Sequence, residues 1–114
     1  MHKVLIINGS PRENGNTSVA VSEVAKTLRN DGIEPLVVRI GSDNIRGCIA
    51  CGYCLKNGKC VFNDKVNELS KIFEEVDGLI VASPVYYASA NATLIATLDR
   101  LFYSSHFDMR FKVG

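Results

Sequence analysis

Residues 4–18 read VLIINGSPRENGNTS and combine a short apolar run, a loop of small residues and the first turn of a predicted helix. The continuous apolar run 4–7 is typical of a parallel strand that is covered on both faces. Residues 8–11 break the strand, and residues 16–18 supply N-cap side chains where a 3.6-residue apolar period begins at Val21. The stretch therefore predicts a buried strand that leads through a loop into a helix N-terminus.

The loop in this stretch is a candidate phosphate site, because a helix N-terminus presents unpaired N–H groups and a positive dipole end. The side chains that can add hydrogen bonds are Ser10, Arg12, Asn16, Thr17 and Ser18. The loop lacks the lysine of a triphosphate loop, the G-x-G-x-x-G of a dinucleotide loop and the cysteine of a protein phosphatase. These absences favour a phosphomonoester bound without a metal. The alternative is an ordinary turn whose hydroxyls only cap the helix.

The sequences GSPR at 9–12 and GNTS at 15–18 resemble the FMN-phosphate loop of the flavodoxin-like NAD(P)H-dependent FMN reductase family, which includes the iron-sulfur flavoproteins. The resemblance continues through GC at 47–48, four cysteines, SPVY at 83–86 and LDR at 98–100. It implies FMN as cofactor, NAD(P)H as co-substrate and a sheet of strand order 2-1-3-4-5. In that topology the loops after strands one and three meet at the ligand crevice.

Composition predicts a single domain over residues 1–114, with 46% hydrophobic and 22% charged residues. The net charge of +1 gives no electrostatic reason to expect binding to nucleic acid or to a membrane. The apolar runs are too short to span a bilayer, and we expect a cytoplasmic protein. In that compartment the cysteines are expected to be thiols or metal ligands rather than structural disulfides.

Strands and helices are predicted to alternate along the chain, which indicates an α/β fold with three layers, α/β/α, around a parallel sheet. Helices are expected at 16–30, from an N-cap at Asp64 onward, and around residues 94–102. The third helix is expected to carry five apolar side chains inward: Leu94, Ile95, Leu98, Leu101 and Phe102. The expected strands are 4–7, 35–40, 78–82 and the opening of a fourth at 110–113. Because a flavodoxin-like domain has five strands, we expect the domain to be truncated after the start of strand four.

The loop after the third strand is the second candidate ligand segment. By resemblance, Pro84, Val85, Tyr86 and Tyr87 border the flavin ring, since tyrosine offers a flat apolar surface with a polar tip. The alternative places both tyrosines in the core or at a subunit interface. In the helix that follows, Asp99 and Arg100 are expected to form a partly exposed ion pair or a dimer contact.

A cysteine-rich loop at 47–61 contains the pattern C-x2-C-x2-C-x5-C. Its candidate metal ligands are Cys48, Cys51, Cys54 and Cys60. Glycines at 47, 52 and 58 allow the tight reversals that aim several sulfurs at one centre. This compact spacing resembles a [4Fe-4S] motif more than the separated C-x2-C pairs of zinc sites. Free or redox-active thiols, structural zinc and disulfides remain the alternatives.

The expected function is that of an FMN-binding oxidoreductase, in which NAD(P)H delivers a hydride to the flavin and an acceptor receives the electrons. One alternative is an electron carrier with FMN, a [4Fe-4S] cluster and little NAD(P)H activity. A second is a non-catalytic module with structural zinc. No catalytic acid or base is assigned, and His2 and His106 are expected at the surface. The acceptor is a small molecule or a protein, and the resemblance implies a homodimer or homotetramer.

Overall fold

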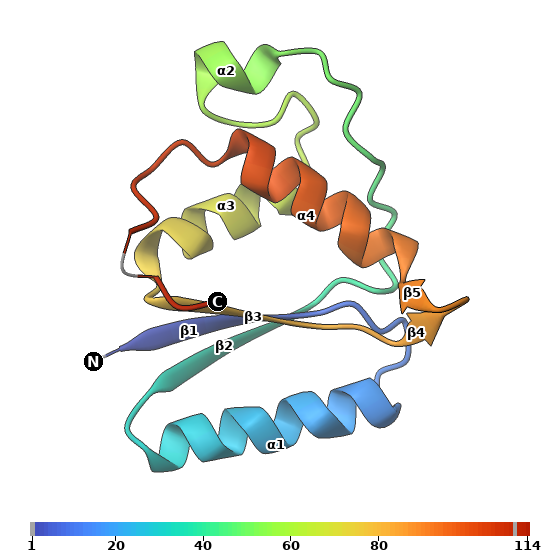
Figure 1. The fold of residues 1–114 in the computed structure, drawn as a ribbon, viewed down its shortest axis with the longest axis vertical. Helices are drawn as coiled ribbons and strands as arrows, with labels where there is room; N and C mark the ends of the chain where they lie inside the picture. Colours follow the sequence, from blue (N-terminus) through green and yellow to red (C-terminus); the bar gives the residue numbers. More distant parts are fainter. Residues whose placement is uncertain (1, 111) are drawn as a thin grey trace.

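The computed structural model describes residues 2–110 and 112–114, and its centre is a parallel three-stranded sheet (Figure 1). The strands are β1 (Lys3–Asn8), β2 (Glu34–Arg39) and β3 (Gly78–Ala82), in the order β2-β1-β3. Leu5 of β1 lies opposite Leu36 of β2 and Leu79 of β3. This order reproduces the first three positions of the predicted 2-1-3-4-5 arrangement.

Helices cover both faces of the sheet, as the predicted three layers require (Figure 1). Helix α1 (Asn16–Asn30) lies on one face, and α3 (Lys65–Glu75) and α4 (Ala92–Ser104) lie on the other. Two small elements were not predicted. Helix α2 (Tyr53–Asn57) lies within the cysteine loop, and a hairpin of β4 (Val85–Tyr86) and β5 (Ser89–Ala90) precedes α4.

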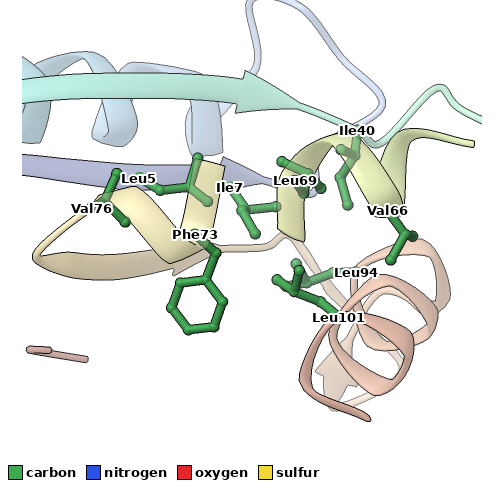
Figure 2. Packing of buried hydrophobic residues seen from close by; sticks show 9 residues of the cluster. All are labelled: Leu5, Ile7, Ile40, Val66, Leu69, Phe73, Val76, Leu94 and Leu101. Atoms are coloured by element: carbon green, nitrogen blue, oxygen red, sulfur yellow. The ribbon is translucent and has the colours of Figure 1, made fainter. Parts of the chain in front are cut away.

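The core has two parts because alternate residues of β1 face opposite sides. Leu5 and Ile7 pack toward α3 and α4, whereas Ile6 packs toward α1. All three side chains are fully buried, which stabilises the fold by about 1.5–3 kcal/mol each. The remaining members of the larger cluster are Ile40, Val66, Leu69, Phe73, Val76, Leu94 and Leu101 (Figure 2).

Two residues of α4 were expected to point inward, and the structure corrects this. Ile95 and Phe102 are 42% and 46% exposed, because the sheet-facing side of α4 is already filled by Leu94 and Leu101. Of the capping expectations, the one for α1 is wrong, because Gly15 is its N-cap residue and no side chain of residues 16–18 caps it, whereas the one for α3 is confirmed. Asp64 accepts a hydrogen bond from the Val66 N–H at the start of α3.

The predicted fourth strand at 110–113 falls partly outside the described residues, since residue 111 is among those not described. Val113 forms a parallel bridge with Gly78 and accepts a hydrogen bond from the Leu79 N–H at 2.8 Å. The chain therefore runs beside β3, on the edge where strand four was expected. Among the described helices, none combines the length and apolar character needed to cross a bilayer.

Candidate functional site

The loops after β1 and β3 meet at the carboxyl ends of their strands and line one open hollow of about 450 Å³. That size lies within the range of small-molecule and cofactor sites. Both predicted ligand segments contribute to it. The lining residues are Ser10, Arg12, Gly15, Asn16, Thr17, Ser83, Pro84, Val85 and Tyr86.

Ser18 shapes the loop rather than lining this hollow. Its hydroxyl accepts a hydrogen bond from the side-chain amide of Asn8 at 3.1 Å and donates one to the Arg12 carbonyl at 3.1 Å. The side-chain oxygen of Asn8 also accepts from the Ser10 N–H at 2.9 Å. Asn8 and Ser10 are each only 3% exposed. The conformation of the loop is therefore fixed from within before any ligand binds.

The N-terminus of α1 is the electropositive part of the hollow. Its N-cap residue, Gly15, has no side chain to cap the helix, and no hydrogen bond within the described residues pairs the N–H groups of residues 16–18. By contrast, α3 and α4 are capped by the side chains of Asp64 and Asn91. Unpaired N–H groups at a helix N-terminus suit an anion. Asn16 and Thr17 add side-chain donors beside them.

Asn91 joins the two loops, and no individual role was predicted for it. The side chain is 5% exposed, donates to the Gly9 carbonyl and accepts from the Ser83 hydroxyl at 3.2 Å. The same oxygen accepts from the Leu94 N–H at 3.3 Å and so caps α4. An asparagine directly before the apolar period of α4 is an N-cap signal that could have identified it.

The β4–β5 hairpin sets the two predicted tyrosines apart. Tyr86 lines the hollow and is 52% exposed, whereas Tyr87 lies outside the lining and is fully exposed. Tyr87 and Ala88 form the turn with φ angles of 49° and 65°, a left-handed conformation that side chains disfavour. Neither tyrosine is in the core, so that part of the alternative is wrong.

All four cysteines line a second hollow together with Arg100, Tyr103 and Ser104 of α4. Helix α2 of the cysteine loop lies on the side of α4 away from the sheet (Figure 1). Cys48 and Cys51 are exposed, while Cys54 and Cys60 are partly buried against α4. The loop reverses at Gly52 and Gly58, whose φ angles of 76° and 68° are left-handed as expected. Gly47 does not adopt this conformation, whereas Ala50 does, with a φ of 55°.

The side chains that line the cysteine hollow are of the type that binds an iron-sulfur cluster, since four thiols of one short segment line a common space. The Ala50 N–H donates to the Cys48 sulfur at 3.3 Å, which is a contact that thiolate ligands commonly receive. Within the described residues, no three His, Cys, Asp or Glu side chains are placed to hold a single metal ion. The free space is about 20 Å³, roughly one water, so the exposed end with Cys48 and Cys51 must open outward to accept a cluster.

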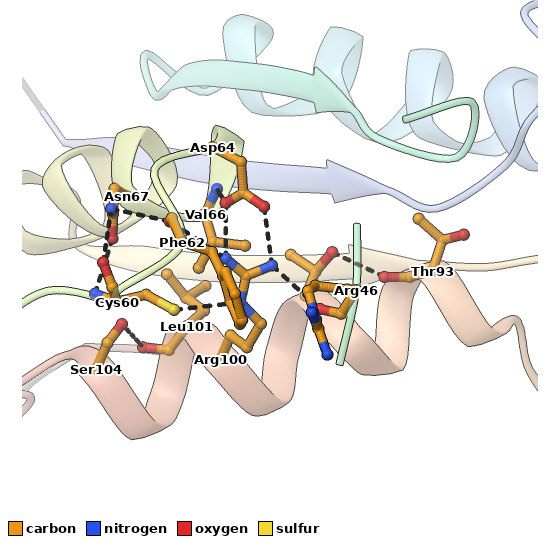
Figure 3. A network of polar contacts seen from close by, with 11 residues as sticks. Arg46, Cys60, Phe62, Asp64, Val66, Asn67, Thr93, Arg100, Leu101 and Ser104 are labelled. Atoms are coloured by element: carbon orange, nitrogen blue, oxygen red, sulfur yellow. Dashed lines mark hydrogen bonds and ion pairs between the residues drawn. The ribbon is translucent and has the colours of Figure 1, made fainter. Parts of the chain in front are cut away.

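Arg100 is the buried charge behind this hollow, and its predicted pairing with Asp99 is wrong. Its side chain is 1% exposed and forms a bidentate ion pair with Asp64 at 2.8 and 2.9 Å (Figure 3). Asp99 is exposed. Burial lowers the pKa of the Arg100 guanidinium, but hydrogen bonds and charge from Asp64 and Cys60 outweigh burial and raise its pKa. Arg100 therefore stays charged inside the protein.

The two histidines lie where the sequence analysis expected them. His2 is exposed and its ring nitrogen lies 3.5 Å from the Asp77 carboxylate, and His106 is exposed in the turn after α4. Neither lines the hollow formed by the β1 and β3 loops.

The order β2-β1-β3, the two helical layers and the loop at the α1 N-terminus define a flavodoxin-like domain. The family model of the NADPH-dependent FMN reductases matches residues 2–114, and the chain belongs to that family. This confirms the family resemblance that was predicted from the loop, the cysteines and the SPVY segment.

Curated relatives include an iron-sulfur flavoprotein of Archaeoglobus fulgidus, 41% identical over 104 residues. That match covers 91% of this chain and 47% of the relative. An iron-sulfur flavoprotein of Methanocaldococcus jannaschii is 38% identical over 98% of this chain and 58% of its own length. The chain thus spans about half the length of these relatives.

Among solved structures, the apo form of an NADH:FMN oxidoreductase superimposes with a TM-score of 0.63 at 28% identity. The match covers 89% of this chain and 50% of that one. The predicted flavodoxin-like fold is confirmed, and the family is one of flavin oxidoreductases.

Proposed function

We propose that the hollow between the β1 and β3 loops binds FMN, with the phosphate at the N-terminus of α1. The observation that carries this proposal is the convergence of both loops on a helix N-terminus whose first N–H groups have no partner among the described residues. Asn16 and Thr17 bind the phosphate with their backbone and side chains, and Ser10 and Arg12 complete the donor set. The segment Pro84–Tyr86 borders the ring.

When bound, FMN supplies the redox chemistry: it accepts a hydride from NADH or NADPH and gives up electrons to a small-molecule or protein acceptor. The chain itself supplies binding and orientation. Asn91 fixes the two loops relative to each other, and the Asn8–Ser18 contacts fix the phosphate loop. Among the described residues that line the hollow, the titratable groups are the guanidinium of Arg12 and the phenol of Tyr86. No acid or base is therefore assigned.

We propose that the four cysteines hold a [4Fe-4S] cluster, and the curated relatives are named iron-sulfur flavoproteins. The convergence of the cysteines on one hollow supports this assignment. The cysteine hollow and the FMN hollow share no lining residue. We propose a homodimer or homotetramer in which the cluster of one subunit lies near the flavin of another. We also propose that the protein is cytoplasmic.

A second candidate is an electron carrier with FMN and a cluster that reacts poorly with NAD(P)H. The relatives' names support it, since they specify a flavin together with iron and sulfur. Anaerobic addition of NADPH separates the two functions. Rapid loss of the flavin absorbance supports the NAD(P)H oxidoreductase, whereas bleaching only by a chemical or protein reductant supports the carrier.

The phosphate assignment is tested with a double variant, Asn16→Ala with Thr17→Ala, and two ligands. FMN should bind about 10- to 100-fold more weakly, because one charge-assisted hydrogen bond contributes about 1.5–3 kcal/mol. Riboflavin lacks the phosphate and should lose little affinity. Equal losses for both ligands would remove the phosphate from this loop.

The cluster assignment is tested with Cys54→Ala. The variant should lose iron and the broad visible absorption while keeping its FMN. Stoichiometric zinc in the wild-type chain in place of iron would instead support the structural alternative.

A further inference from the structure

The fourth cysteine is held more firmly than the others. The Cys60 backbone N–H donates to the side-chain oxygen of Asn67 at 2.9 Å, and the Asn67 amide donates back to the Cys60 carbonyl at 3.1 Å. The Cys60 sulfur accepts a hydrogen bond from Nε of Arg100 at 3.4 Å. Helix α3 thus fixes the backbone of Cys60, and helix α4 fixes its sulfur.

The guanidinium of Arg100 has partners on each of its three nitrogens (Figure 3). Besides Cys60 and Asp64, it donates to the carbonyls of Arg46 and Phe62 at 3.1 and 3.4 Å. The guanidinium carbon of Arg100 also lies 5.2 Å from the centre of the Phe62 ring. One buried cation therefore connects both ends of the cysteine loop to the start of α3.

The ion pair between Arg100 and Asp64 does not by itself require a contact between Arg100 and the Cys60 sulfur. The two-fold contact with Asp64 uses the terminal nitrogens, which leaves Nε free to face the sulfur. Hydrogen bonds to the thiolates are one of the factors that set the reduction potential of an iron-sulfur cluster. A donor with a positive charge stabilises the more negative, reduced form.

Resting on the proposed cluster, we propose that Arg100 is a positioning residue that fixes Cys60 as the rigid ligand and raises the cluster's reduction potential through its Nε–H···Sγ hydrogen bond. Asp64 moderates this effect, because its carboxylate balances most of the guanidinium charge. The exposed cysteines, Cys48 and Cys51, adjust to the cluster, while Cys60 does not move. Arg100 is not among the residues that line the FMN hollow.

The test is an anaerobic redox titration of the cluster, followed by its EPR signal, in the full chain loaded with iron and sulfide. In Arg100→Gln the ratio of reduced to oxidised cluster at a fixed potential should fall about tenfold, which is about 59 mV for one electron. In Asp64→Asn the ratio should rise, since the cation stays and loses its counter-charge. Asparagine is a good N-cap, so this variant keeps the start of α3.

Arg46→Gln is the matched control. Arg46 is exposed and its guanidinium carbon lies 4.5 Å from the centre of the same Phe62 ring, but among the described residues its side chain makes no hydrogen bond to a sulfur. Its loss of one positive charge should leave the potential unchanged, because exposed charges are screened.

The possible results distinguish failure of the proposed cluster from failure of the proposed role of Arg100. A wild-type chain that takes up no iron overturns the cluster and the role of Arg100 together. A wild-type cluster whose potential is the same in Arg100→Gln, or shifts in the same direction in Asp64→Asn, overturns the role of Arg100 alone. Loss of the cluster from both variants while Arg46→Gln keeps it would make Arg100 a structural residue only, and would also overturn the tuning.

Discussion

Replacement of Gly41 by alanine is expected to displace the phosphate loop. Gly41 follows β2, and a Cβ atom built there would lie 2.1 Å from the Ser10 carbonyl carbon and 2.3 Å from the Gly9 oxygen. Ordinary contact begins at 3.4 Å, so the two backbones must separate by about 1.3 Å. That movement is large enough to break the 2.9 Å hydrogen bond from the Ser10 N–H to Asn8.

Overpacking of this kind costs about 1–3 kcal/mol. At about 4 °C per kcal/mol for a chain of this size, Gly41→Ala should lower the melting temperature by about 4–12 °C. FMN should bind at least tenfold more weakly, because the loop no longer holds its donors in place. Calorimetric unfolding and flavin fluorescence titration measure the two effects.

Gly47→Ala is the control for this prediction. It lies in the same connection between β2 and α3, its φ is not left-handed, and an added Cβ would meet nothing within 4 Å. It should leave both the melting temperature and FMN affinity unchanged. Equal behaviour of the two variants would refute the close approach of Gly41 to the loop.

Three further substitutions test other parts of the structure. Asn91→Ala should lower the free energy of unfolding by about 2–4 kcal/mol in urea titrations, since it removes the N-cap of α4 and leaves the Gly9 carbonyl without its donor. A loss under about 0.5 kcal/mol would contradict the role of Asn91 in joining the two loops. Ala88→Gly should stabilise the chain by about 0.5–1 kcal/mol, because the φ of 65° suits glycine, whereas the control Ala90→Gly in β5 should destabilise it. Phe73→Ala should cost about 3–5 kcal/mol, and Phe102→Ala, at a 46% exposed position of the same aromatic contact, clearly less; equal losses would disprove the assigned burial.

Local signals were enough to predict the main elements. The structure reproduces the expected bounds of α1 at 16–30 and β3 at 78–82, because apolar periodicity, caps and glycines mark these ends within a few residues. Seven of the nine residues that line the hollow between the β1 and β3 loops were predicted; Gly15 and Ser83 were not, and the predicted Ser18 and Tyr87 lie outside the lining. The convergence of the two loops follows from parallel strand order, which places successive loops at the same edge of the sheet.

The features that were missed depend on contacts between distant segments. Arg100 was expected to be partly exposed, because nothing near it in the sequence reveals Asp64, 36 residues away, as its partner. Gly41 carries no signal of its own, since its close approach to Ser10 arises only when β1 and β2 pair. The hairpin turn at Tyr87 and Ala88 lacks the glycine or asparagine that usually marks such turns.

The central claim is that one chain binds both FMN and a [4Fe-4S] cluster. It is tested most directly by an anaerobic visible spectrum of freshly purified protein, with iron, sulfide and zinc assayed on the same sample. The protein is expected to show a two-banded flavin spectrum over a broad absorption, with about four irons per chain. Flavin bands without iron would contradict the cluster, and a colourless protein that takes up no added FMN would contradict the proposed flavin site.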